Sequence, residues 1–202
     1  MNSFNYERSS LNLYILPICL FQIFSNTILK TALFLGVIII LGMSCPLKSE
    51  ALHLHNLHTQ EVFNGLHKDA KGHYISSHLK HINALLRDHR TQEIYPIQGT
   101  LLDLLDDIAY CLCPKNPDSI SFDIISGYRS PKTNQILRRK NKSVSKSSLH
   151  MAGKAVDIRV PGVALKKLRD IAQSLKKGGV GYYPNSNFIH IDTGKIRYWT
   201  GS

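Results

Sequence analysis

Three residues in the C-terminal third of the chain have the side-chain types that bind a catalytic zinc ion. His150 and Asp157 lie seven residues apart in the segment HMAGKAVD, and His190 follows thirty-three residues after Asp157. A catalytic zinc needs three protein ligands and a fourth position that stays open to water. These three residues therefore form a candidate metal site.

Two strands are expected to hold this site. In KAVDIRV, Asp157 stands between the apolar Val156 and Ile158, so its carboxylate faces away from both of them. In FIHIDTG, His190 and Asp192 alternate with isoleucines and share one face in the same way. Neighbouring strands with this pattern would present the imidazole and the carboxylates side by side.

The phrase around the first two residues resembles a known signature. SLHMAGKAVD, residues 148–157, fits the pattern S-x-H-x-x-G-x-A-x-D at every fixed position. It resembles the signature of the zinc D-Ala-D-Ala peptidases, which include D,D-carboxypeptidases, vancomycin-resistance dipeptidases and a hedgehog signalling domain. In that group the His and Asp of the phrase bind zinc and a later His completes the site. The resemblance implies that His150, Asp157 and His190 bind Zn²⁺.

Further segments resemble the YcbK-like murein endopeptidases more closely. They are NLHTQE at 56–61, INALLRDHRTQEIYPI at 82–97, SGYRSPKTN at 126–134, GGVGYYP at 178–184 and HIDTGKIRYW at 190–199. The resemblance covers essentially everything after residue 51. It implies a zinc peptidase domain over 51–202 that binds peptidoglycan peptides and hydrolyses their cross-links.

The resemblance also implies which residues meet the substrate. Arg129 in SGYRS is similar to the family arginine that faces the substrate, where it would stabilise an oxyanion or anchor a carboxylate. Tyr128 and Ser148, from the same two phrases, are the other candidate substrate-binding residues.

The general base is marked less clearly. Better-known branches of the group place a Glu or His three or two residues before the last ligand, where this chain has Asn187 and Phe188. Asp192 is the best catalytic substitute because it shares the strand face of His190. Its alternative role is to orient His190. His58 is another candidate base.

Two functional alternatives stay open. A D,D-carboxypeptidase or dipeptidase would act on free D-Ala-D-Ala ends, and the openness of the substrate groove would distinguish it from an endopeptidase. A catalytically silent wall-binding module would keep the fold without turnover. The missing upstream base favours this second alternative.

Composition and charge are consistent with a wall-binding domain. The chain has 202 residues, 43% of them hydrophobic, and a formal net charge of +11, to which residues 1–50 contribute only +1. A basic domain suits nucleic acid, an anionic membrane surface or an acidic polymer such as a bacterial wall, and charge alone does not choose between them. The lysines and arginines are scattered and no nucleic-acid-binding motif occurs, so nucleic acid is not an expected partner. We expect a monomer, although the sequence does not fix the oligomeric state.

Residues 1–50 are expected to be a signal peptide or a membrane anchor. The apolar runs Leu11–Phe24 and Thr31–Met43 are each shorter than the roughly 20 residues that a membrane-spanning helix needs. Lys30 before the second run and small residues after it have the layout of a signal peptide. We therefore expect an exported protein in the periplasm or cell envelope, with a membrane tether through the N-terminus as the alternative.

The periodicity of the remaining chain predicts an α+β domain. A first strand in LHLHNLHTQEVF is expected at a sheet edge, and the many histidines between residues 53 and 89 are expected to be mostly solvated. Helices are expected in SSHLKHINALLRDH, QGTLLDLLDDIAYCLC and ALKKLRDIAQSLKK, with a short basic helix or turn in KTNQILRRKN. We expect a small, mainly antiparallel sheet flanked by helices, as in hedgehog domains and D,D-peptidases.

Overall fold

The computed structural model of the protein describes residues 51–142 and 144–201. The segment predicted to be a signal peptide or anchor, residues 1–50, lies outside the described residues. In the described part, no helix has both the length and the apolar character needed to cross a bilayer.

Seven strands in the described part of the chain form one sheet in the order β2-β1-β3-β4-β6-β5-β7. Their bounds are Ala51–Asn56 for β1, Val62–Leu66 for β2, Ser121–Ser126 for β3, Ala155–Arg159 for β4, Gly179–Tyr183 for β5, Phe188–Asp192 for β6 and Arg197–Thr200 for β7. The pairs β1–β3 and β5–β7 are parallel, and the other pairs are antiparallel.

The sheet differs from the one expected. The expected mixture of helices and strands is confirmed, but the sheet is larger than predicted and mixed in direction. Parallel pairing of β1 with β3 requires a long crossover, and the chain between 67 and 120 supplies it with two helices. The first strand is also not an edge, because β1 has β2 on one side and β3 on the other.

The helices have recognisable sequence signals. They are α2 at Ser76–Leu85, α3 at Gly99–Leu112, α4 at Pro131–Lys140 and α5 at Leu165–Ser174, and the short 3₁₀ turns are η1 at Pro117–Ser119 and η2 at Leu149–Ala152. At the start of α4 the Ser130 hydroxyl accepts a hydrogen bond from the Thr133 amide, and Pro131 occupies the first turn. This cap begins α4 directly after the segment that carries Arg129.

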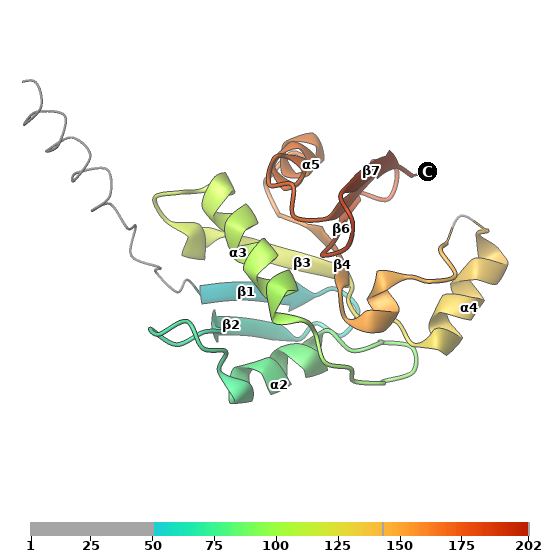
Figure 1. Cartoon of the computed structure of the whole chain (residues 1–202), viewed down its shortest axis with the longest axis horizontal. Coiled ribbons are helices and arrows are strands. Elements are labelled where there is room, and N and C mark those ends of the chain that lie inside the picture. The colour runs from blue at the N-terminus through green and yellow to red at the C-terminus, as the bar shows by residue number, and fades with distance from the viewer. Residues whose placement is uncertain (1–50, 143, 202) are drawn as a thin grey trace, which may run out of the picture. The chain divides into compact units, whose positions relative to one another are not determined.

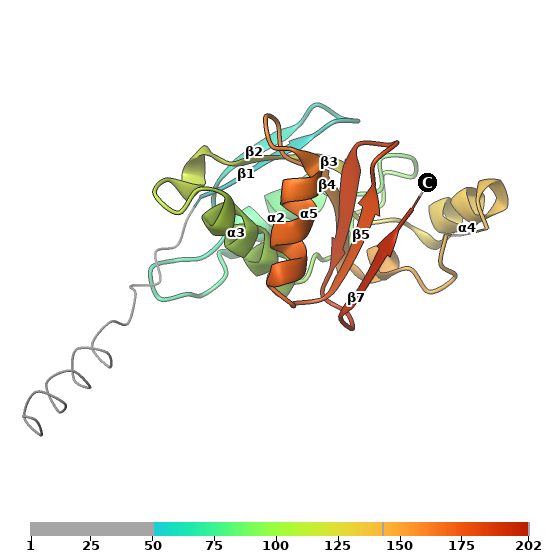
Figure 2. The same cartoon turned by 90° about the horizontal axis from the view of Figure 1, so that it is seen from above.

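One face of the sheet forms the core. Helices α3 and α5 pack against each other on this side, as Figure 2 shows, and α2 packs beside β2. Alternate residues of the central strands point toward these helices and are at most 1% exposed: Leu52, Leu54, Phe122, Ile124, Val156, Ile158, Ile189 and Ile191. The strand period of two therefore sends the intervening polar residues to the opposite face.

Helix α4 takes a different position from the core helices. It stands at one end of the domain, away from α2, α3 and α5 (Figures 1 and 2). The chain returns from α4 through η2 directly into β4. This return places η2 at the polar face of the sheet, where β4 and β6 lie next to each other.

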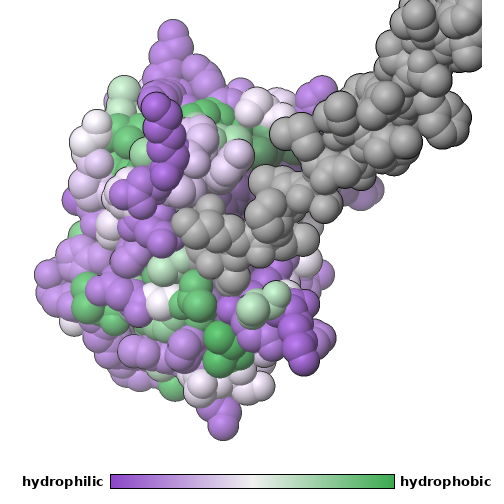
Figure 3. All heavy atoms as spheres, turned by 90° about the vertical axis from the view of Figure 1, so that its left-hand side faces the viewer, coloured by the Kyte–Doolittle hydropathy of each residue, from purple (hydrophilic) through white to green (hydrophobic). Residues whose placement is uncertain are grey.

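The face of the domain that Figure 3 draws is mostly polar. Figure 3 shows one side of the domain, on which hydrophilic side chains dominate and apolar ones form small separate patches. Such a surface matches a basic, water-exposed domain.

The core should be sensitive to truncation at the centre of the sheet. Ile124 on β3 is 0% exposed, whereas Ile94 in a loop is 60% exposed. We expect Ile124→Ala to lower the free energy of unfolding by about 2–5 kcal/mol, because it leaves a cavity between the sheet and the helices. The same change at Ile94 should stay within about 0.5 kcal/mol. Urea unfolding of both variants followed by circular dichroism checks this, and equal losses would contradict the assigned core.

Candidate metal centre

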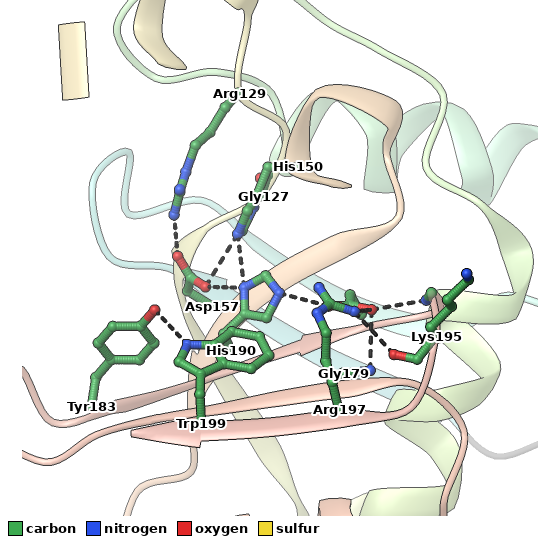
Figure 4. A network of polar contacts seen from close by, with 12 residues as sticks. Gly127, Arg129, His150, Asp157, Gly179, Tyr183, His190, Lys195, Arg197 and Trp199 are labelled. Atoms are coloured by element: carbon green, nitrogen blue, oxygen red, sulfur yellow. Dashed lines mark hydrogen bonds and ion pairs between the residues drawn. The ribbon is translucent and has the colours of Figure 1, made fainter. Parts of the chain in front are cut away.

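The three predicted ligands come together on the polar face of the sheet (Figure 4). Asp157 of β4 and His190 of β6 are direct partners in the antiparallel register. The Asp157 Oδ1 atom lies 2.9 Å from His190 Nδ1 and 3.2 Å from His150 Nε2. The two ring nitrogens are 3.1 Å apart. His150 reaches the pair from η2, which precedes β4.

Hydrogen bonds on the outer sides of the two rings fix which nitrogens face inward. His150 Nδ1 lies 2.7 Å from the Gly127 carbonyl oxygen, which can only accept, so this nitrogen carries the proton. His190 Nε2 lies 3.0 Å from Asp192 Oδ2 and donates to that carboxylate. When both rings are neutral, the lone pairs of His150 Nε2 and His190 Nδ1 therefore point at the Asp157 carboxylate. Such an arrangement of acceptors fits a metal cation.

Burial and neighbouring charges determine the protonation states of the candidate ligands. It lowers the pKa of His150 to about 4, so this ring is neutral at pH 7, as a metal ligand must be. For Asp157, burial favours the neutral acid, but His150 and the Arg129 guanidinium outweigh it and hold the pKa well below its usual range. Asp157 is thus an ionised carboxylate that is only 2% exposed.

The surroundings of His190 favour the protonated, positively charged form of its ring. Burial lowers its pKa, but the hydrogen bonds to Asp157 and Asp192 outweigh burial and raise the pKa overall. A proton on this ring supplies the positive charge between two carboxylates that a bound cation would otherwise supply. The three ligand atoms lie close enough together to share one metal ion.

Glycine at 153 explains one fixed position of the signature phrase. Gly153 ends η2 with a φ of 63°, a left-handed conformation that favours glycine. A Cβ atom there would also clash with the Pro96 carbonyl oxygen. The turn sends the chain from His150 directly into β4. His150 and Asp157 can therefore reach the same site although they are only seven positions apart in the chain.

Arg129, three residues after the end of β3, contacts two of the candidate ligands, Asp157 and His150. Its Nη2 pairs with the Asp157 oxygen that faces away from the two imidazoles, and its Nε donates to Ser126 Oγ at 2.9 Å. Its backbone amide donates to the His150 carbonyl oxygen at 3.3 Å. Arg129 therefore neutralises one side of the Asp157 carboxylate and leaves Oδ1 to the metal side.

The candidate metal centre opens into a cavity of about 510 Å³, a size that suits a small ligand or a peptide segment. Arg129 and Ser148 line it together with the three ligands. One wall comes from the end of α4 and the loop after it, and the other from β5, β6 and β7: Leu137, Lys140, Asn141, Val144, Tyr183, Phe188, Arg197 and Trp199.

Comparison with known proteins identifies the family. The family model described as peptidoglycan L,D-endopeptidase MepK matches residues 45–199. The chain belongs to the MepK family. The resemblance to murein endopeptidases is thereby confirmed.

Curated relatives in this family cover most of the chain. The probable peptidoglycan L,D-endopeptidase MepK of Haemophilus influenzae is 40% identical over 162 residues, which are 80% of this chain and 85% of the relative. The peptidoglycan L,D-endopeptidase MepK of Escherichia coli K12 is 43% identical over 157 residues, 78% of this chain and 83% of the relative. No solved structure gives a significant match.

Two of the residues expected at the site of this MepK-family chain lie elsewhere. Tyr128 is 7% exposed, and its ring stacks on Tyr95 with the centroids 4.8 Å apart. The His58 ring stacks on His89 at 3.7 Å, and His58 Nε2 lies 3.1 Å from the Ile125 carbonyl oxygen. Neither Tyr128 nor His58 lines the cavity.

Asp192 contacts the candidate ligand His190 on the side of the ring that faces away from Asp157. It is 0% exposed, and its carboxylate accepts hydrogen bonds from the Gly179 and Gly194 amides and from Arg197, in addition to His190. Burial alone would raise the pKa of Asp192, but these donors hold it far below its usual range. Asp192 is therefore a firmly ionised hydrogen-bond acceptor.

A second group of possible ligands lies in another part of the described chain, formed by His67, Asp103 and Asp106. His67 Nε2 lies 3.3 Å from an oxygen of each aspartate. Here Lys68 already pairs with Asp103 at 2.6 Å, so the protein itself supplies a cation. His67 is also 0% exposed, which makes it a buried exception among the histidines of residues 53–89 that are expected to be mostly solvated.

The metal centre can be tested by removing one ligand at a time. We expect the wild-type chain to bind one zinc ion and His150→Ala, Asp157→Ala and His190→Ala each to lose most of it, because two ligands hold zinc poorly. His73→Ala is the matched control, since His73 also contacts an aspartate but its side chain is 76% exposed. Elemental analysis of desalted protein measures the zinc. A folded ligand variant with full zinc would contradict the assignment.

Proposed function

We propose that this chain is a zinc-dependent endopeptidase that hydrolyses peptide cross-links of bacterial peptidoglycan. The observation that carries the proposal is the convergence of His150 Nε2, Asp157 Oδ1 and His190 Nδ1 at the base of a 510 Å³ cavity. Membership of the MepK family, whose curated relatives are named peptidoglycan L,D-endopeptidases, supplies the substrate class.

The residues around the proposed metal position would have different roles in the hydrolysis. Bound zinc supplies Lewis-acid activation of the attacking water and of the scissile carbonyl. Arg129, in the cavity wall beside Asp157, would stabilise negative charge that develops on the carbonyl oxygen. Ser148 lines the same cavity and would position the peptide backbone.

We assign Asp192 a positioning role rather than the role of general base. A base must reach the water in the cavity and must accept its proton near neutral pH. Asp192 instead lies behind His190 and is saturated with donors. Its contact with His190 Nε2 keeps the opposite ring nitrogen aimed at the metal.

One observation favours a second candidate function, a silent wall-binding module. Among the described residues that line the cavity, the three ligands are the only carboxylate and imidazole groups. No further side chain of those types is therefore placed to take a proton. The digest described below distinguishes this module from an enzyme.

The proposed substrate also sets the proposed location. Peptidoglycan lies outside the cytoplasm, so we propose that residues 31–45 direct export and that the mature domain acts in the cell envelope. The net charge of +10 beyond residue 50 would favour association with an anionic wall.

The proposed reaction can be tested on defined dimeric muropeptides. We expect the purified chain to convert dimers into monomers, a chelator to abolish the conversion, and added zinc to restore it. Mass spectrometry separates the outcomes by product. Loss of a single terminal D-Ala would indicate a carboxypeptidase instead, and binding of muropeptides without any product would indicate the silent module.

The role of Asp192 can be tested with Asp192→Asn, which keeps the shape but not the charge. For a positioning residue we expect zinc affinity to fall roughly 10–100-fold, with much of the turnover restored at saturating zinc. Asp170→Asn is the control, because the Asp170 side chain is 53% exposed on α5. A loss of about 10²–10⁴-fold in turnover at unchanged zinc affinity would identify Asp192 as the general base.

A further inference from the structure

Strand β7 reaches the metal centre from an unexpected distance. In the sheet order β4-β6-β5-β7 it is separated from β6 by the whole of β5. Two strand spacings amount to about 10 Å. Even so, two side chains of β7, Arg197 and Trp199, contact Asp192 and His190 of β6. The residues of β5 that lie between β6 and β7 must therefore be small enough to let these side chains pass.

Two glycines of β5 provide that space. Gly179 pairs with Arg197 in the parallel register, and Gly181 pairs with both Trp199 and His190. A Cβ atom on Gly179 would overlap the Asp192 carboxylate and would lie 2.7 Å from Arg197 Nη1. A Cβ atom on Gly181 would lie 2.6 Å from the Trp199 ring. The side chains of β7 thus cross β5 over bare backbone.

Arg197 binds the acceptor that orients His190. Its Nη2 donates to Asp192 Oδ2 at 2.7 Å, and its Nη1 donates to Asp192 Oδ1 at 3.2 Å. Asp192 Oδ2 in turn accepts from His190 Nε2 at 3.0 Å. The guanidinium therefore favours the ionised, correctly turned carboxylate and, through it, the ring tautomer with its lone pair on the metal side.

Trp199 supports the same ring from its side. The indole centroid lies 5.3 Å from the His190 centroid, and the Trp199 Nε1 donates to the Tyr183 hydroxyl at 3.0 Å. Arg197 also lies over the indole, 5.1 Å from its centroid. Figure 4 shows these side chains arranged around His190. The position of the indole is thus held from two sides.

We infer that Arg197 and Trp199 are positioning residues of the metal centre, and that glycine is required at 179 and 181 to let them reach it. The inference rests on the proposed metal site, but it concerns residues to which neither the motif nor the family match assigns a role. A purely structural Arg197 would instead fasten the edge strand and leave metal binding unchanged.

Zinc affinity separates these two roles. We expect Arg197→Gln to weaken zinc binding roughly 10–100-fold, as measured by competition with a chromophoric chelator on the full chain. Arg197→Lys should recover only part of this, because an ammonium cannot hold both carboxylate oxygens as a guanidinium does. Arg159→Gln is the matched control, because Arg159 pairs with Asp123 at 3.0 Å and neither residue lines the cavity. Its zinc affinity should stay within about two-fold of wild type.

The single tryptophan of the chain gives a second readout. Because Trp199 packs on His190, we expect zinc to change the intrinsic fluorescence of the wild-type protein. Gly181→Ala should displace the indole, shift the emission of the metal-free protein and reduce the response to zinc. Gly65→Ala is the control, since Gly65 is also a strand glycine but its added Cβ would come no nearer than 3.4 Å to Phe63.

The outcomes distinguish the inference from the proposed function. A wild-type chain that binds no zinc contradicts both. If wild type binds zinc and folded Arg197→Gln binds it equally well, only the inference is overturned. Should Arg197→Gln fail to fold, Arg197→Lys decides the matter, and wild-type zinc affinity in that variant would overturn the inference.

Discussion

The buried negative charge of Asp157 is the constraint on which the rest of the site depends. A carboxylate that is 2% exposed is stable only if its charge is balanced. Arg129 balances one oxygen, whereas the other faces His150, which is neutral, and His190, so that either a proton on His190 or a bound cation must supply positive charge there. The pocket therefore requires positive charge at one place, and the surrounding hydrogen bonds keep that place defined.

The fold separates stability from chemistry between the two faces of one sheet. Isoleucines and valines of β4 and β6 pack against the helices on one side. The residues between them, Asp157 and His190, are direct cross-strand partners on the other side. Cross-strand partners in an antiparallel pair have Cβ atoms only about 5 Å apart, so the register alone brings these two ligands into range. His150 needs a different device, the 3₁₀ turn that ends at Gly153.

How far the sequence predicts this site depends on whether a residue's position is set locally. Strand alternation correctly places Asp157 and His190 on one face, and the signature phrase adds His150. A neighbour in the sequence does not have to be a neighbour at the site. Tyr128 adjoins Arg129 in the chain, but its ring packs in the core and stacks on Tyr95. The donors to Asp192 and the roles of Arg197 and Trp199 depend on the order β6-β5-β7, which no local pattern contains. The parallel pairs of the sheet escape prediction for the same reason.

The crossing of β5 by two side chains also limits how this part of the protein can evolve. A larger residue at 181 fits only if the residue at 199 becomes smaller, because the Trp199 ring passes over Gly181. At 179 an added side chain would meet the Asp192 carboxylate as well as Arg197. If Arg197 and Trp199 position the metal centre as inferred, a single change at 181 or 199 disturbs it, whereas a compensated double change does not have to. Substitutions at 181 and 199 are therefore expected to be epistatic and to change in coupled steps, whereas a change at 179 also has to avoid Asp192.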